Sequence, residues 1–112
     1  MNVNVYLYFG VTEENLNSKE KYDVIKEFDD CKFVPSHDVI PCTGDMLQFN
    51  YDDIDGTPDY WYEAENTPGI SSDEKTLIAM HEIYSYNWKV NVRTFSGSAI
   101  FLDLVRDKLI NS

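Results

Sequence analysis

The chain has 112 residues, a length that suits one domain, so we expect residues 1–112 to form a single domain. Its hydrophobic fraction of 43% is ordinary for a globular protein and excludes a fully disordered chain. It carries 20 acidic side chains against 9 of Lys plus Arg, which gives a formal net charge of −11. Because such a surface repels phosphate, we expect no direct binding to nucleic acid or to anionic membranes. The charge favours a basic protein surface as partner.

No stretch of the sequence approaches the roughly 18 consecutive apolar residues that a membrane-spanning helix needs. The first residues, Met1–Phe9, lack the positive region and the small-residue cleavage site of a signal peptide. These observations predict a cytoplasmic protein. In that compartment we expect Cys31 and Cys42 as thiols rather than as a disulfide.

The first predicted element is a strand over residues 3–9, which Gly10 ends. Apolar and polar side chains alternate there, and this is typical of a strand with one face on a core. One face holds Val3, Val5, Leu7 and Phe9, and the other holds Asn2, Asn4, Tyr6 and Tyr8.

Residues 18–29 predict a short amphipathic helix. The apolar positions recur every three residues, at Tyr22, Ile25 and Phe28. Ser18 can cap this helix, with Glu20 in its first turn. A strand through Tyr22–Phe28 is the competing interpretation.

The middle of the chain predicts two short strands and a tight turn. Cys31–Val34 is the first strand. Pro41–Gly44 predicts a turn, because Pro presets one backbone angle and Gly tolerates positive φ. Met46–Phe49 follows as a strand. After it, residues 50–75 are irregular and acidic, and loops of that length are uncommon unless they are functional or disordered.

The C-terminal third predicts a three-stranded antiparallel meander. Its strands are Thr76–Tyr84, Trp88–Thr94 and Ala99–Val105. The links Ser85–Asn87 and Ser96–Ser98 have the length of hairpin turns. Arg106–Asn111 can add one helical turn.

Together these elements predict a mainly β fold. We expect a small antiparallel barrel or curved sheet with the C-terminal meander and at most one short helix. The alternative is an α+β fold, in which the helix over residues 18–29 packs on an antiparallel sheet.

A short motif favours the barrel. Ile40 and Pro41 are followed by Gly44, Asp45 and the alternating strand Met46–Phe49. This pattern resembles small barrel-like proteins of unknown function from bacteria and their phages. The resemblance implies a small β-barrel-like fold and no activity, and the acidic stretch after residue 50 departs from the compact pattern.

The sequence contains only part of a calcium-binding motif. Asp53–Gly56 matches positions 3, 5 and 6 of an EF-hand loop. Positions 1 and 12 of that loop would be Tyr51 and Tyr62, which supply no carboxylate. The segment is therefore interpreted as an acidic turn in solvent.

A zinc site is not encoded locally either. The chain has the right residue types for zinc in Cys31, His37, Cys42 and His81. No two of them have a spacing that sets two ligands side by side, so a buried cysteine and surface histidines are the favoured interpretation. The sequence predicts no metal and no cofactor.

No catalytic motif is complete. His81 and Glu82 begin a His-Glu-x-x-His motif, but residue 85 is Ser. No nucleophile elbow, P-loop or dinucleotide fingerprint is present, so we predict that the protein is not an enzyme. The alternative function, a small-ligand or metal-dependent domain, would use His37, Asp38, Cys42 and His81.

The predicted working surface is an acidic, aromatic stretch. Residues 45–82 hold ten carboxylates and one base, so about −9 of the net −11 lies there. Exposed tyrosines beside carboxylates suit contact with an Arg/Lys-rich surface. Acids that only keep the protein in solution are the plainer interpretation. The predicted partner-binding residues are Asp52, Asp53, Asp55, Asp59, Tyr60, Trp61, Tyr62, Glu63 and Glu65.

These observations predict a non-enzymatic acidic protein-binding module or inhibitor. Its acidic face would occupy a basic surface of a partner, such as one that normally holds nucleic acid. Small phage-encoded proteins that block host defence nucleases are similar in size and charge, which is an analogy of class only. The other alternative is a structural subunit of a phage or mobile-element particle.

Overall fold

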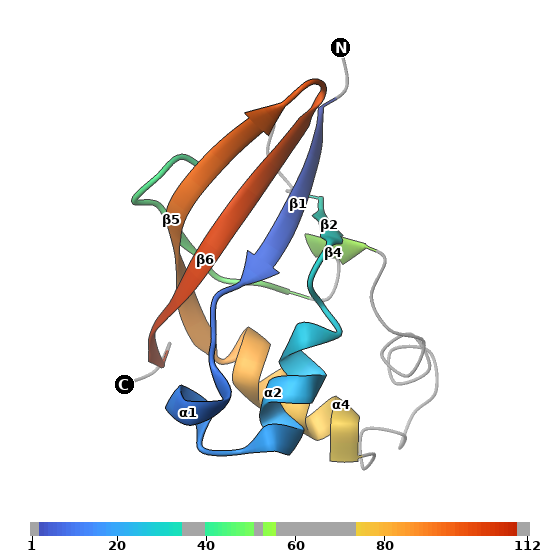
Figure 1. Ribbon diagram of the computed structural model, residues 1–112, viewed down its shortest axis with the longest axis vertical. Coiled ribbons are helices and arrows are strands. Elements are labelled where there is room, and N and C mark those ends of the chain that lie inside the picture. Colours follow the sequence, from blue (N-terminus) through green and yellow to red (C-terminus); the bar gives the residue numbers. More distant parts are fainter. Residues whose placement is uncertain (1–2, 35–39, 51–52, 56–73, 110–112) are drawn as a thin grey trace.

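The computed structural model describes residues 3–34, 40–50, 53–55 and 74–109, and its strands form one curled, half-barrel sheet (Figure 1). In chain order the elements are β1 (Asn4–Phe9), α1 (Glu13–Leu16), α2 (Lys19–Lys26), β2 (Cys31–Phe33), β3 (Met46–Leu47), β4 (Ile54–Asp55), α4 (Glu74–Ala79), the π-helix η3 (Met80–Tyr84), β5 (Tyr86–Ser96) and β6 (Ala99–Leu109). The strand order is β3-β5-β6-β1-β2-β4. The prediction of a mainly β fold with a curved sheet is confirmed.

The centre of the sheet is a parallel pair, which corrects the expectation of a purely antiparallel sheet. β1 pairs with β6 in parallel, from Asn4 opposite Ala99 to Phe9 opposite Leu104. The other strand pairs are antiparallel. The alternation in each strand predicts which face is buried, but it carries no information on the direction of a partner far away in the sequence.

The core lies on the inner face of this sheet. Every second residue of β1 is buried, at Val5, Leu7 and Phe9, and so is every second residue of β6 from Ile100 to Leu104. Trp88 of β5 packs edge-on against Phe9, with ring centres 4.9 Å apart. Its indole nitrogen donates a hydrogen bond of 2.9 Å to the backbone oxygen of Ile83. This bond joins η3 to the sheet.

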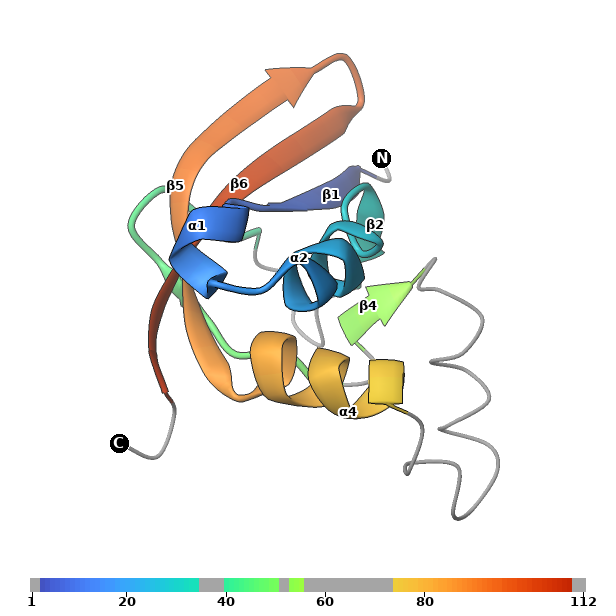
Figure 2. The same ribbon diagram turned by 60° about the horizontal axis from the view of Figure 1, so that its bottom comes forward.

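The helices lie on the inner side and at one end of the sheet, where α2 and α4 run beside each other (Figure 2). The predicted helix over residues 18–29 is confirmed as α2, and the hydroxyl of Ser18 caps it by accepting a hydrogen bond of 3.2 Å from the backbone nitrogen of Lys21. Val24 and Ile25 are buried in the common core. Among the described helices none is long and apolar enough to cross a membrane.

The expectations of at most one helix and of a three-stranded meander are wrong. Thr76–Tyr84 is not a strand, because α4 and η3 together form one helical segment there. Its buried residues include Ala79 and Ile83, which lie one turn apart on one face. A short apolar run does not distinguish a buried helix from a buried strand, which explains the error. α1 is a further helix that was not predicted.

The remaining part of the meander is confirmed as the β5–β6 hairpin. Its turn is Gly97-Ser98, and Gly97 has the positive φ of 61° that such a two-residue turn needs. β6 continues to Leu109, so the helical turn expected from Arg106 is wrong as far as the structure describes the chain.

The predicted turn before β3 is also confirmed. The backbone nitrogen of Asp45 donates to the oxygen of Cys42 over 2.9 Å, and Gly44 has φ 96°. The strand expected over Met46–Phe49 is shorter, because only Met46–Leu47 pairs with β5. The strand expected over Cys31–Val34 is present as β2. Most of the irregular, acidic stretch expected over residues 50–75 lies outside the described residues.

Replacement of a central core residue tests this packing. We expect Leu102→Ala to lower the free energy of unfolding by about 2–5 kcal/mol, because Leu102 is fully buried and the change leaves a cavity. Leu77→Ala is the matched control, since Leu77 is 50% exposed and its truncation should cost no more than about 0.5 kcal/mol. Urea unfolding measures both. Equal losses would contradict the assignment of the inner face.

Candidate functional site

Two of the predicted partner-binding residues, Asp53 and Asp55, are described by the structure, and the other seven lie outside the described residues. The Asp53 carboxylate accepts a hydrogen bond of 2.9 Å from the backbone nitrogen of Asn50, so it stabilises the local turn. Asp55 is exposed on β4, the edge strand of the sheet. Of these two, Asp55 is the more exposed to solvent.

Asp55 belongs to a row of side chains that crosses the sheet on the face opposite the core. Tyr6 alternates with buried Val5 and therefore points away from the core. Paired residues of neighbouring strands project to the same side. The strand registers therefore place Phe101, Tyr6, Lys32 and Asp55 in one row, from β6 to β4.

A second row lies beside the first. Tyr8 is paired with Asp103, and its hydroxyl donates a hydrogen bond to the carboxylate of Asp30. The Phe101 ring stacks on Tyr6 at 5.7 Å between centres and is tilted against Tyr8 at 5.8 Å. Together Tyr8, Thr94, Phe101 and Asp103 line an open hollow of about 290 Å³. We use the name outer face for the set Tyr6, Tyr8, Asp30, Lys32, Asp55, Thr94, Phe101 and Asp103.

Several carboxylates act on the Tyr8 hydroxyl of the outer face. The hydrogen bond to Asp30, and then burial and the charges of Asp30, Asp29 and Asp103, raise the pKa of Tyr8 from 10.0 to about 12. Burial, and then the charges of the carboxylates at Asp29, Asp30 and Asp55, raise the pKa of the Cys31 thiol to about 12. Cys31 lies on the core side of β2, so its pKa reflects burial first and these carboxylates second.

The positive side chains do little to offset this charge. All nine Lys and Arg residues are within the described part of the chain. Ion pairs inside the protein engage Lys19, Lys21, Lys26, Lys75 and Arg106. Among the described carboxylates only Glu82 is buried, so the others face solvent at least in part. Lys32 is the base within the outer face.

Glu82 is the centre of a separate charge cluster on the inner side of the sheet. Its carboxylate pairs with Arg106 of β6 and, at 3.1 Å, with Lys21 of α2. The Arg106 guanidinium also lies 4.1 Å over the ring of Tyr86. Burial raises the pKa of Glu82, but the hydrogen bonds from Arg106 and Lys21 outweigh it, so that the net pKa is lowered. The cluster joins η3, α2 and β6, and its role is structural.

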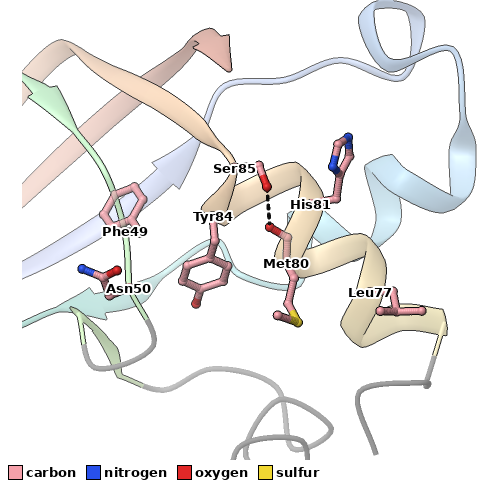
Figure 3. A pocket seen from close by; sticks show the side chains of 7 residues that line it. All are labelled: Phe49, Asn50, Leu77, Met80, His81, Tyr84 and Ser85. Carbon is pink, nitrogen blue, oxygen red and sulfur yellow. Dashed lines mark hydrogen bonds between the residues drawn. The ribbon is translucent and has the colours of Figure 1, made fainter. Parts of the chain in front are cut away.

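The helical segment also borders a pocket of about 410 Å³ (Figure 3). The pocket is lined by Phe49, Asn50, Leu77, Met80, His81, Tyr84 and Ser85. Figure 3 shows the side chains of Met80 and Tyr84 on one side of the helix and the imidazole of His81 on the other. His81 lies near Glu82 instead, with 4.0 Å between Nε2 and the carboxylate. The imidazole of His81 is therefore not directed into the pocket.

The described residues among those considered for zinc or for a nucleophile form no common cluster. Cys31 is buried in β2, whereas Cys42 is exposed beside the turn, and no disulfide joins them. A guanidinium nitrogen of Arg93 lies 2.9 Å from the Cys42 sulfur. His37 and Asp38 are outside the described residues. Within the part of the chain that the structure describes, no group of three or more His, Cys, Asp or Glu could hold a metal ion.

Comparison of the chain with protein-family models, with curated proteins and with solved structures finds no match. We therefore infer the function from the side chains of this chain alone.

Sequence reasoning placed the contact surface on the acidic stretch and did not select the tyrosines of β1. The signal was present, because the alternation in residues 3–9 already puts Tyr6 and Tyr8 opposite the apolar face. Their neighbours Phe101 and Asp103 were not foreseeable in the same way, since the parallel pairing brings them there.

Removal of the buried charge tests the Glu82 cluster. We expect Glu82→Gln to lower the free energy of unfolding at pH 7 by about 1.5–3 kcal/mol, the range for hydrogen bonds to charged groups. Because the folded-state pKa of Glu82 lies below the ordinary 4.5, its contribution is complete above that value and is lost as the pH falls through the lowered pKa. The difference between variant and parent should therefore shrink in acid.

Urea unfolding at pH 7 and in acid measures this difference, and Glu14→Gln, at an exposed position of α1, is the control of equal charge. A loss that is the same at all pH values would show that the carboxylate charge of Glu82 does not stabilise the fold.

Thiol reactivity tests the placement of the two cysteines. At pH 8 we expect Ellman's reagent to label one thiol in the folded protein, Cys42, because Cys31 is buried and its pKa is raised to about 12. Cys42→Ser should abolish labelling of the folded protein, and unfolding should expose the second thiol. Rapid labelling of both thiols in the folded protein would contradict the position of β2.

Proposed function

We propose that the protein is a non-enzymatic acidic binding module or inhibitor, and that its outer face occupies a basic surface of a partner protein. The observation that supports this most is the combination of three aromatic rings with carboxylates on one sheet face that no described helix covers. Aromatic residues are enriched at protein interfaces, where their rings bury large area and carry few rotatable bonds.

The position of the core explains why no described helix covers this face. The buried residues of α2 join the same core as the inward residues of β1, so the helices lie on the inner side. Tyr6, Tyr8 and Phe101 remain half-buried by one another and reachable from solvent. In a half-exposed aromatic cluster with an acidic border, the rings offer area to bury and the carboxylates can pair with the basic side chains of a partner.

The class of partner follows from the charge. A net charge of −11 attracts a basic surface over a distance of about one Debye length and steers the encounter. Surfaces that normally hold nucleic acid are basic, so such a surface is the partner we propose. We also predict that the acidic stretch with Asp52, Asp59 and Glu63 takes part in this contact.

Capture from a bacterial lysate tests the proposal. We expect a basic protein to be held at low salt and lost at about 0.5 M salt, where screening shortens the reach of each charge to a few ångströms. Asp55→Asn combined with Asp103→Asn should reduce capture several-fold at low salt, because both positions lie on the outer face.

Glu13→Gln combined with Glu14→Gln is the matched control, since it removes the same charge from α1. Equal loss with both pairs would assign the effect to net charge and refute the outer face as the contact. A partner held equally at both salt concentrations would refute the electrostatic mechanism.

A further inference from the structure

We propose that the hollow between Tyr8, Thr94, Phe101 and Asp103 binds the guanidinium group of an arginine side chain from the partner protein. This inference rests on the proposed function, because it names the chemistry of the partner residue that the outer face receives. The hollow has about 290 Å³ and is open to solvent, so it suits the end of a long side chain.

The geometry offers the two kinds of group that a guanidinium prefers. The rings of Tyr8 and Phe101 lie 5.8 Å apart at 46°, and together they present aromatic surface to the hollow. Cations are attracted to an aromatic face within about 6 Å of the ring centre. Asp103 is paired with Tyr8 in the sheet register, so its carboxylate stands at the same place. A planar guanidinium can stack on a ring and donate to the carboxylate at once.

The same combination already binds an arginine elsewhere in this chain. The guanidinium of Arg106 lies 4.1 Å over the Tyr86 ring while it donates to the Glu82 carboxylate. In the hollow the rings and the carboxylate are in place, but among the described residues, which include every Lys and Arg, none forms an ion pair with Asp103. The outer face therefore offers rings and a carboxylate to a cation from another molecule.

The receiving groups are also held in place before any partner arrives. The hydroxyl of Tyr8 is engaged by Asp30, which fixes the ring against the β1–β2 edge of the hollow. The Phe101 ring is held from the other side by Tyr6, with 5.7 Å between centres. Fixed side chains lose little conformational entropy on binding. Arginine is favoured over lysine because the compact, strongly hydrated ammonium cannot stack on a ring and donate two parallel hydrogen bonds.

Titration of the isolated protein with small cations tests this inference without any partner. The probes are N-acetyl-arginine amide and N-acetyl-lysine amide, and the readout is the change in backbone amide resonances by NMR. We expect the arginine probe to shift Tyr8, Thr94, Phe101 and Asp103 most, and to bind several-fold more tightly than the lysine probe.

Variants separate a built site from general attraction. Phe101→Leu and Asp103→Asn should each weaken arginine binding several-fold, and the unchanged remainder of the spectrum would show that the fold is intact. Asp107→Asn, further along β6 and exposed, is the control with the same charge change and should have no effect.

Equal shifts from both probes, spread over all exposed carboxylates, would overturn the inference, as would an equal effect of Asp103→Asn and Asp107→Asn. The two proposals can fail separately. Arginine binding at the hollow with no salt-dependent partner would refute the proposed function alone. A salt-dependent partner that the outer-face variants release, together with no preference for arginine, would refute the guanidinium site alone.

Discussion

The parallel pairing of β1 with β6 is the constraint on which the rest of the structure depends. It joins the first strand to the C-terminal hairpin in the middle of the sheet, with two further strands on each side of this pair. On its inner side it sets Leu7 beside Leu102, both fully buried. On its outer side it sets Tyr8 beside Asp103. A shift of the register by one residue would exchange these faces and expose the core, so the apolar side chains fix the position of the outer ones.

The Glu82 cluster attaches the helices to the end of a long strand. Arg106 continues the inward positions of β6 beyond the apolar core, where a charged side chain would otherwise be left partly buried. The Glu82 carboxylate pairs with Arg106, and the Tyr86 ring lies against its guanidinium. Lys21 is a second cation paired with the same carboxylate. An acidic protein thus places its one buried carboxylate, among those described, where two cations meet it. Elsewhere its described carboxylates remain at the surface.

Local patterns predict much of this fold, and their limits are physical. The alternation in residues 3–9 and the cap at Ser18 were sufficient for β1 and α2, because both signals act within a few residues. The segment Thr76–Tyr84 was misassigned because its apolar residues suit either a buried strand or a buried helix. The sequence predicts only part of the outer face. Its tyrosines follow from alternation, whereas their aromatic and acidic neighbours arrive through a pairing that spans almost the whole chain.

That long-range pairing has a consequence for the timing of synthesis. Contacts between residues distant in sequence form late, because a long loop of chain must be closed before they can stabilise anything. β1 is synthesised before β6, so Tyr6 and Tyr8 meet the Phe101 ring only after β6 has been made and the hairpin has docked. The outer face is therefore absent from a growing or interrupted chain. A partner of the kind proposed would therefore recognise the finished fold and not the sequence of any one strand.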